Sequence, residues 1–561
     1  MSTLTAEYLK LKKSNCKNCY KCIRHCPVKS IRFDGAEAHI VADECILCGH
    51  CFVVCPQNAK EIRDDTATAA ELIKAGAVAT VAPSFAAGFK GVSFEALRSA
   101  LIQLGFVDAY ETALGATLVK AEYDSMLEKG DRDVIITSCC QSVNLLIRKY
   151  FPEALPYLAD VITPMEASAR LIKREHPDKA VVFIGPCISK KQECDEPDSN
   201  VDTAITFEEL SGMLENAGIT LNADGAPGAK GGRARIFPTD GGILKSMYRK
   251  SDKYSYISID GTDNCIETLK EVAGGKLHNC FIEMSACAGS CIGGPAIERK
   301  EHSLVKDYTL IDQISGDTDF KVEPLEKGGL KKEQEYINLN RDMPGSAAID
   351  EILKKMGKIR PEDELNCGSC GYNTCREKAV AVYQGKADLT MCLPFLKEKA
   401  ESFSDTIIKN TPNGILVLDE QLTVQQINQA ACEILHLRQP SDILGDQVIR
   451  ILDPADFVMV LSDEKNIHDK PTYLAEYDKY VELSIIYDKS YHVLICLMRD
   501  ITDLKKQSEQ KEQLRDETIK VTDGVIEKQM RVVQEIASLL GETTAETKIA
   551  LTKLKESLES D

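Results

Sequence analysis

The sequence contains no tryptophan, and aromatic residues make up only 6% of its 561 positions. No apolar run approaches the roughly 18 residues that a membrane span needs; the longest, residues 75–89, is interrupted by Pro83 and Ser84. The N-terminal residues lack the apolar core of a signal peptide. There is no block of lysine or arginine either, and the formal charge of -19 repels phosphate backbones. We therefore expect a cytoplasmic protein that binds neither membranes nor nucleic acid.

Cysteine, in contrast, is abundant, with 22 residues. Disulfides are disfavoured in a reducing compartment, so this many thiols predict metal binding. The cysteines are also clustered: eight precede residue 56, and four more lie between residues 367 and 392. At about 100 to 200 residues per domain, a chain of this length should form several domains.

Residues 1–65 carry one cysteine motif twice. Both copies read C-x2-C-x2-C-x3-C-P, the spacing of a two-cluster bacterial ferredoxin, in which the fourth cysteine of each run binds the other cluster. One 4Fe-4S cluster is assigned to Cys16, Cys19, Cys22 and Cys55. The second is assigned to Cys26, Cys45, Cys48 and Cys51. Two zinc knuckles are the alternative, but the doubled pattern with both prolines favours clusters that form an electron wire.

Apolar runs alternate with helical patterns between residues 72 and 355. The runs that read as buried strands are residues 77–85, 133–140 and 180–187. Residues 141–158 follow one of them as a predicted helix. This alternation predicts an α/β domain with a mainly parallel sheet. Ligands bind beyond the carboxyl ends of strands in such domains, where Cys140 and Cys187 would lie.

Three cysteine motifs fall in this domain: TSCCQ, GPCISKKQE and MSACAGSCIGG. One cysteine of the first motif and three from the others supply four thiolates, which suit a further 4Fe-4S cube. These ligands are Cys140, Cys187, Cys287 and Cys291. Cys139 is left over, and the alternative to a functional role is a small buried hydrophobe beside the site.

These motifs resemble the three signatures of the iron-only (FeFe) hydrogenases, whose H-cluster joins a 4Fe-4S cube to a two-iron centre. The resemblance covers residues 1 to about 395. It implies that Cys291 bridges the cube to the diiron centre, which carries CO, cyanide and a bridging dithiolate. H2 and protons are the implied substrates, ferredoxin or another redox protein is the implied partner, and hydrogenase maturation proteins are implied as well.

Two further residues acquire roles from this resemblance. Cys139 matches the cysteine that passes protons to the dithiolate amine, and Lys190 matches the lysine that donates to a cyanide ligand. Heterolytic cleavage of H2 needs a metal to take the hydride, a nearby base and a proton relay. A lysine in a dry pocket suits an anionic ligand. The alternative for Lys190 and the adjacent Lys191 is an ordinary solvated charge.

Several positions depart from the family's signatures. Gly185 and Ser285 stand where catalytic members have methionines that pack on the diiron centre. Gln141 replaces a proline, and Tyr123 and Met126 stand where those members have relay glutamates. The resemblance therefore implies the same cofactor with slower turnover and a changed response of the diiron site.

A further cysteine cluster occupies residues 356–398, which we call the four-cysteine segment. It reads C-x2-C-x4-C-x16-C and resembles a small iron–sulfur module found in redox and corrinoid proteins. The resemblance implies a 4Fe-4S cube on Cys367, Cys370, Cys375 and Cys392. A structural zinc ion is the alternative, because four thiolates suit it as well.

Residues 401–504 resemble a PAS domain. Short alternating strands surround an Asn-Gly turn, Asn428 precedes a helical run, and the last strand ends in RDIT. PAS domains usually bind a small ligand or a protein partner and relay the change to a following helix. Haem is an alternative, but a lone histidine is more often structural. The candidate haem ligands are His436, His468 and His492.

Residues 505–561 have a helical pattern with an apolar seam at seven-, four- and three-residue steps. The seam consists of Leu514, Val521, Val525, Val532, Ile536 and Leu539. It resembles the dimerising helices of sensor kinases and predicts a homodimer. No histidine follows His492, so the chain itself is not a histidine kinase. Its output must be the dimer interface or a partner, such as a kinase or phosphatase.

The sequence thus predicts a multidomain α+β and α/β chain: a two-cluster ferredoxin domain, an α/β hydrogenase domain, a small iron–sulfur module with four cysteines, a PAS domain and C-terminal helices. The leading hypothesis is a slow, reversible FeFe hydrogenase that senses H2 or redox state. The alternatives are a metabolic ferredoxin- or NAD(P)-linked hydrogenase subunit with a docking tail, and a non-catalytic iron–sulfur scaffold. No G-x-G-x-x-G follows a strand, so nicotinamide would have to bind a partner subunit.

Overall fold

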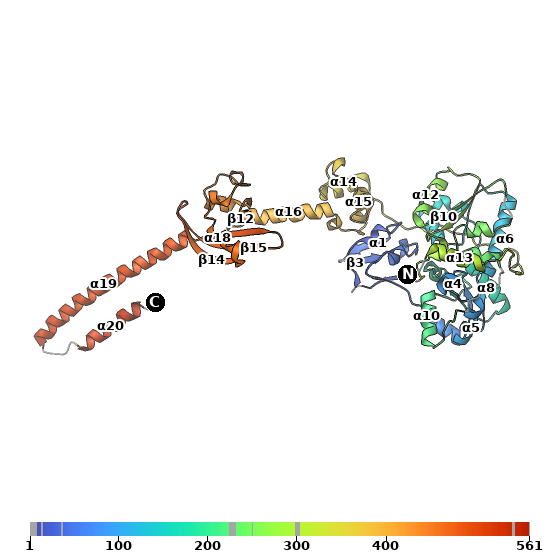
Figure 1. Ribbon diagram of the computed structural model, residues 1–561, viewed down its shortest axis with the longest axis horizontal. Coiled ribbons are helices and arrows are strands. Elements are labelled where there is room, and N and C mark those ends of the chain that lie inside the picture. Colours follow the sequence, from blue (N-terminus) through green and yellow to red (C-terminus); the bar gives the residue numbers. More distant parts are fainter. Residues whose placement is uncertain are drawn as a thin grey trace. The chain divides into compact units, whose positions relative to one another are not determined.

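The computed structural model describes most of the chain, in two compact units that comprise residues 1–395 and 396–561. The described residues are 8–12, 15–34, 37–223, 232–248, 251–297, 303–540 and 545–559. Figure 1 shows the ribbon and labels some of the helices and strands of both units. Helices and both parallel and antiparallel sheets are present, so the predicted multidomain α+β and α/β architecture is confirmed.

The N-terminal segment repeats one small structure around its two cysteine runs. Its strands pair antiparallel, β1 (Leu9–Leu11) with β4 (Lys60–Ile62) and β2 (Ile31–Asp34) with β3 (Glu37–Ile40). Each run contains a one-turn helix, α1 (Lys21–Arg24) or α2 (His50–Val53). Equivalent positions of the two runs share positive φ angles: Asn18 and Leu47, Tyr20 and Gly49, Lys29 and Asn58. The sequence repeat is therefore also a repeat of backbone conformation.

Two parallel sheets form the central domain, in place of the single mainly parallel sheet expected. The strand orders are β6-β5-β8-β9 and β10-β11-β7, and every pairing is parallel. The strands are β5 (Val78–Val81), β6 (Ala109–Glu111), β7 (Val134–Ile136), β8 (Val181–Ile184), β9 (Thr203–Ile205), β10 (Ser255–Asp260) and β11 (Cys280–Ser285). The strands β5, β7 and β8 are buried along their whole length, and all their residues except Thr80 are apolar.

Helices follow most of these strands. The longer ones are α3 (Thr66–Lys74), α5 (Phe94–Leu104), α6 (Ala113–Lys129), α7 (Gln141–Tyr150), α8 (Pro164–Glu175), α10 (Phe207–Asn216), α12 (Thr262–Ala273) and α13 (Leu304–Ile314). Short helices include α4 (Phe85–Gly88), α9 (Ser189–Cys194) and α11 (Gly242–Ser246). The helix predicted over residues 141–158 ends at Tyr150, because Pro152 cannot continue it. Residues 152–157 form a 3-10 helix instead.

The four-cysteine segment contains α15 (Cys375–Tyr383), which packs against the preceding helix α14 (Ser346–Lys355). Leu353, Met356 and Ala379 form their small shared core together with Cys392. α16 (Leu393–Asn410) begins at the residue after Cys392, so the last cysteine of the segment is covalently continuous with a helix.

The second unit contains one antiparallel sheet in the order β13-β12-β16-β15-β14. The strands are β12 (Gly414–Asp419), β13 (Val424–Ile427), β14 (Ile467–Leu474), β15 (Lys479–Asp488) and β16 (Val493–Asp500). Burial alternates along β12 and β16, so one face of the sheet packs on a core. Asn428 caps α17 (Gln429–Ile434) by accepting the N–H of Ala431 at 2.9 Å, and α18 (Ala455–Asp463) packs on β15.

The chain continues as α19 (Thr502–Leu540), a helix of 39 residues, and α20 (Ala545–Glu559). Along α19 the seam residues Leu514 and Val521 are 66% and 67% exposed. No described residue covers this part of the seam. Among the helices of the described residues, none combines the length and the apolar character that crossing a membrane requires.

Candidate metal centre

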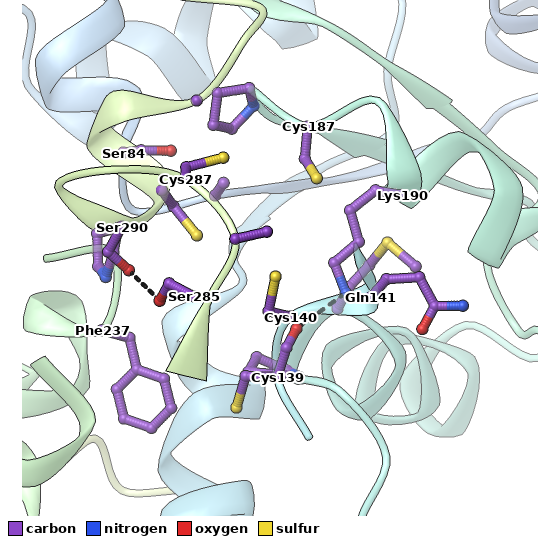
Figure 2. A pocket seen from close by; sticks show the side chains of 18 of the residues that line it. Ser84, Cys139, Cys140, Gln141, Cys187, Lys190, Phe237, Ser285, Cys287 and Ser290 are labelled. Atoms are coloured by element: carbon purple, nitrogen blue, oxygen red, sulfur yellow. Dashed lines mark hydrogen bonds between the residues drawn. The ribbon is translucent and has the colours of Figure 1, made fainter. Parts of the chain in front are cut away.

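The ends of three parallel strands bring the central cysteine motifs together. β7 and β11 belong to one sheet and lead to the first and third motifs, whereas β8 belongs to the other sheet and leads to the second. One cavity is lined by all four predicted cube ligands: Cys140, Cys187, Cys287 and Cys291. Figure 2 shows the thiols of Cys140, Cys187 and Cys287 turned toward the same space.

The chemistry of this cavity fits an iron cluster bound by thiolates. Apolar side chains such as Ala82, Phe183 and Pro295 supply much of its wall. Burial raises the pKa of Cys140, and the nearby thiol of Cys187 raises it further, because a thiolate there loses its water and meets a like charge. Bound cations reverse this effect, since metal binding replaces the thiol protons.

The two adjacent cysteines have different surroundings. Cys139 lies with its sulfur 3.3 Å from the hydroxyl oxygen of Tyr123 on α6, and Figure 2 shows its thiol turned away from that of Cys140, on the side of Phe237. Burial raises the pKa of Cys139 to about 12, so this residue keeps its proton at neutral pH. Cys139 is therefore a protonated thiol in the cavity wall, directed away from the other sulfur atoms.

Hydrogen bonds beyond Cys139 end inside the protein. The hydroxyl of Tyr123 accepts the backbone N–H of Ser138 at 3.0 Å and lies 3.2 Å from the Ser138 hydroxyl. That hydroxyl donates to the carbonyl oxygen of Val161 at 2.6 Å. A buried carbonyl cannot pass a proton on, and the buried thioether of Met126 cannot either. This branch of the network is closed to protons.

Lys190 is a buried charge in the cavity wall, 9% exposed. Its ammonium donates to the carboxylate of Glu193 at 2.5 Å and to the carbonyl oxygen of Cys139 at 3.5 Å. Burial opposes the charged form, but the carboxylate outweighs it and raises the pKa of Lys190. Lys191 is also buried and pairs with Asp65 of the N-terminal segment. Neither lysine is the solvated charge that the sequence allowed as an alternative.

The two positions predicted to replace methionines differ in their placement. Ser285 lines the cavity, and its hydroxyl lies 2.8 Å from that of Ser290. Gly185 is not among the described residues that line it. A Cβ at Gly185 would lie 2.7 Å from the ring of Phe183, which does line the cavity. The ring of Phe183 thus occupies the space that a side chain at position 185 would need.

Gln141 lines the same cavity but directs its amide into a polar network. The amide donates to Gln192 at 2.9 Å and to Glu196 at 3.1 Å, and it accepts from Asn144 at 3.2 Å. A proline at this position could not make these hydrogen bonds. The glutamine therefore ties the start of α7 to α9 beside the cube ligands.

Glu283 is a wall residue that was not anticipated from the sequence. Its side chain is 1% exposed and accepts the backbone N–H of Leu244 at 3.0 Å. Burial raises the pKa of Glu283 to about 7. A sequence signal was present, because Glu283 is a single charge within the apolar strand FIEMS.

Four of the eight N-terminal cysteines line a common cavity. The set assigned to the second cluster lines one small cavity: Cys26, Cys45, Cys48 and Cys51. The two runs also stabilise their fourth cysteines in the same way, since Ser30 donates its N–H to the sulfur of Cys26 and Ala59 does so to Cys55, both at 3.3 Å. Of the set assigned to the first cluster, Cys19 is exposed.

The cysteines of the four-cysteine segment line a further small cavity: Cys367, Cys370, Cys375 and Cys392. Lys378 also lines it, and burial lowers the pKa of this lysine to about 8. No three His, Cys, Asp or Glu side chains of the described residues are grouped as around a single metal ion.

Family models match four parts of the chain. Residues 75–295 match the iron-only hydrogenase large subunit, C-terminal domain, and residues 8–67 match a 4Fe-4S dicluster domain. Residues 363–394 match an Fe-S cluster model, and residues 402–470 match a PAS domain. Three of these four models describe iron–sulfur or iron-only hydrogenase domains, and the fourth describes a PAS domain.

Relatives with curated names agree with these matches. Iron hydrogenase 1 of Clostridium pasteurianum is 23% identical over 47% of this chain and 53% of its own length. The NADP-reducing hydrogenase subunit HndD of Solidesulfovibrio fructosivorans is 26% identical over 46% and 56%, respectively. The periplasmic Fe hydrogenase large subunit of Nitratidesulfovibrio vulgaris is 25% identical over 51% and 85%. Residues 75–295 thus form a domain of the iron-only hydrogenase large-subunit family, and residues 402–470 match a PAS domain; the chain spans about half the length of the first two relatives.

The solved structures that match parts of the chain include a variant of the FeFe-hydrogenase HydA1 from Chlamydomonas reinhardtii. It is 16% identical, with a TM-score of 0.40 over 49% of this chain and 99% of that chain. The PAS domain of nitrogen regulation protein NR(II) from Vibrio parahaemolyticus is 20% identical, with a TM-score of 0.16 over 18% of this chain and 97% of that chain.

Proposed function

We propose that the chain is an FeFe hydrogenase that slowly interconverts H2 with protons and electrons. The observation that carries this proposal is the convergence on one cavity of Cys139, Cys140, Cys187, Lys190, Cys287 and Cys291. Four of these cysteines would hold the cube, and Cys291 would also bridge it to the diiron centre. When bound, that centre would supply the metal site at which H2 is split heterolytically.

The chain's own residues would manage charge and protons around that centre. Lys190, buried and charged, would donate to an anionic ligand of the diiron centre. Cys139 would hold the exchanging proton as a thiol. Because the hydrogen bonds of Tyr123 and Ser138 end at a carbonyl oxygen, the route through α6 would not carry that proton to solvent. This closed route supports slow turnover.

Slow turnover suits sensing, and the rest of the chain supports that role. Three further 4Fe-4S clusters would connect the H-cluster to ferredoxin or another redox protein. The PAS domain and α19 would pass the resulting state to a kinase or phosphatase, and the exposed seam of α19 would join two copies of the chain. Hydrogenase maturation proteins would supply the diiron centre, and we place the protein in the cytoplasm.

The test uses full-length protein with reconstituted iron–sulfur clusters, loaded with a synthetic diiron centre. Infrared bands of metal-bound CO and cyanide should appear, and H2 oxidation and evolution should both be measurable but slow. Turnover as fast as that of catalytic family members would contradict the sensory role. It would support the metabolic alternative, a ferredoxin- or NAD(P)-linked subunit, to which the name of the HndD relative points.

A non-catalytic scaffold is the second candidate function. One observation favours it: the cytosolic Fe-S cluster assembly factor NAR1 of Kluyveromyces lactis is 32% identical over 91 residues, which is 19% of that protein. A scaffold would show no CO or cyanide bands after loading with the diiron centre. Their presence would exclude it.

A further inference from the structure

The cysteine set of the second ferredoxin cluster lies where three parts of the first unit meet. We name this set the junction site: Cys26, Cys45, Cys48 and Cys51, which line one cavity. The ligand loops on either side of that cavity contact the central domain and the four-cysteine segment through different residues. The contacts on each side determine where electrons at this site can go.

On one side the junction site faces the cube of the central domain. Gly49, next to Cys48, packs so closely on Pro295 that a Cβ at position 49 would lie 2.5 Å from the proline ring. The ammonium of Lys149 donates to the carbonyl oxygen of Cys45 at 2.7 Å. Cys48 and Cys287 line one common cavity, so ligands of the two sites face the same space.

On another side the four-cysteine segment packs against the chain that leads to Cys26. Lys29 donates to the carbonyl oxygens of Ile23 at 3.2 Å and Arg24 at 3.0 Å, and also to that of Gly371 at 2.9 Å. Gly371 lies between Cys370 and Tyr372 in sequence, has a φ of +92°, and would place a Cβ 2.9 Å from the Ile23 side chain. Only a glycine permits this approach of the two ligand loops.

A second tether holds the four-cysteine segment beside Cys45. Glu44 accepts the ammonium of Lys386 at 2.6 Å and the guanidinium of Arg341 at 2.5 Å. The backbone N–H of Phe33 donates to the carbonyl oxygen of Lys386 at 2.7 Å. Glu44 is buried, so this ion pair is shielded from water. The two tethers thus lie near two different ligands of the junction site, Cys26 and Cys45.

A buried tyrosine lies between the tethers. Tyr372 is 2% exposed and packs in one apolar cluster with Cys26, Cys45 and Cys370. Its hydroxyl has no hydrogen-bond partner among the described residues. Burial, together with the nearby thiols of Cys370 and Cys26, raises the pKa of Tyr372. One buried aromatic ring therefore lies near cysteines of both sets.

From these contacts we infer that the electron path branches at the junction site. One branch leads to the cube in the central domain, and the other leads directly to the cluster of the four-cysteine segment, without passing through the first ferredoxin cluster. One electron leaves the reduced junction cluster and reduces the cluster of the four-cysteine segment, with no bond made or broken. Since α16 begins directly after Cys392, this last cluster is the redox centre attached to the tail. The inference rests on the proposed clusters but not on H2 turnover.

The test is electron paramagnetic resonance of full-length protein carrying its reconstituted 4Fe-4S clusters but no diiron centre, reduced stepwise with dithionite. Neighbouring reduced clusters split or broaden each other's signals. We expect the signal of the four-cysteine segment, identified by its loss in Cys375→Ala, to be split in the parent protein. The splitting should persist in Cys19→Ala, which lacks a first-cluster ligand, and disappear in Cys48→Ala, which lacks a junction ligand.

Loss of the splitting in Cys19→Ala and its persistence in Cys48→Ala would overturn the inference. That result would place the cluster of the four-cysteine segment beside the first cluster in a linear wire. An unsplit signal from this segment in the parent protein would also overturn it. Glu44→Gln retains every cysteine and weakens one tether, so it should reduce the splitting at unchanged iron content; Glu61→Gln, at a partly exposed glutamate paired with Lys12, should not. Failure of the protein to turn over H2 would leave these spectra unaffected, so the two proposals fail separately.

Discussion

The hydroxyl oxygen of Tyr123 accepts the backbone N–H of Ser138 at 3.0 Å, one residue before the two adjacent cysteines. A helix and a strand end are thereby joined at the cavity wall, through a side chain that is 0% exposed. The same hydroxyl lies 3.3 Å from the Cys139 sulfur. Because the hydrogen bonds beyond it end at the carbonyl oxygen of Val161, Tyr123 holds the two cysteines in place and does not carry protons away from them.

Replacement of Tyr123 by phenylalanine tests this role. The change leaves the N–H of Ser138 without its partner, which should cost about 1 to 3 kcal/mol of stability. H2 turnover and iron content should be unchanged, because the tyrosine leads only to a carbonyl oxygen. Tyr256→Phe is the control, since its ring contacts Phe281 but its hydroxyl bonds to Ser251. A strong loss of turnover in Tyr123→Phe alone would make the tyrosine a relay.

Replacement of Cys139 by alanine should lower H2 turnover and leave the iron content unchanged. Turnover in both directions should fall by a factor on the order of 10² if the thiol is the proton carrier. Iron content and the CO and cyanide bands should be retained, because Cys139 is directed away from the cube ligands. Cys194→Ala, at a buried cysteine of α9, should leave turnover unchanged. Equal rates for Cys139→Ala and the parent protein would mean that Cys139 only packs in the cavity wall and carries no proton.

Glu283 makes stability depend on pH. Its pKa of about 7 in the folded protein exceeds the ordinary value of 4.5, so between these values the folded state binds a proton that the unfolded state has lost. Stability from this group therefore falls as the pH rises from 4.5 to 7. Glu283→Gln removes the titration and should stabilise the protein at pH 8 by about 3 kcal/mol.

The measurement is the thermal unfolding of the parent protein and the variant between pH 5.5 and pH 8. The advantage of Glu283→Gln should increase across this range and level off above pH 7. Glu271→Gln, at an exposed position of α12, should show no such trend. An advantage that is constant with pH would mean that Glu283 is already ionised throughout.

Asn428 joins four backbone groups of the second unit. Its side-chain oxygen accepts the N–H groups of Ile415 and Ala431, and its amide donates to the carbonyl oxygens of Ile408 and Asn413. Asn428→Ala should therefore destabilise this unit by about 2 to 4 kcal/mol, with the cluster absorbance unchanged. Calorimetry on the full chain would report it, with Asn410→Ala, an exposed asparagine of α16, as the control.

Three of the predicted cysteine sets each line one cavity, and they could be grouped in advance because the spacing within each motif is a local property of the sequence. The division of the central domain into two sheets could not be predicted, since it depends on whether β8 pairs with β5 or with β7, which are distant along the chain. The sequence shows that Tyr123 and Met126 replace the relay glutamates of the family. It does not show that the hydrogen bonds of Tyr123 end at a carbonyl oxygen, because this depends on where Ser138 and Val161 lie in the fold. Gly185 shows the same limit, because the ring that fills its surroundings belongs to Phe183.

The contacts around Gly371 also determine the order in which the protein can be completed. Arg24 and Lys29 reach partners that follow them by 345 and 342 residues. During synthesis, the N-terminal ligand loops are made long before the segment that covers them, and such distant contacts form late. A cluster inserted early would therefore face solvent and oxygen on that side until the four-cysteine segment folded onto it. The end of the first unit thus acts as a shield for iron that the first fifty-five residues bind.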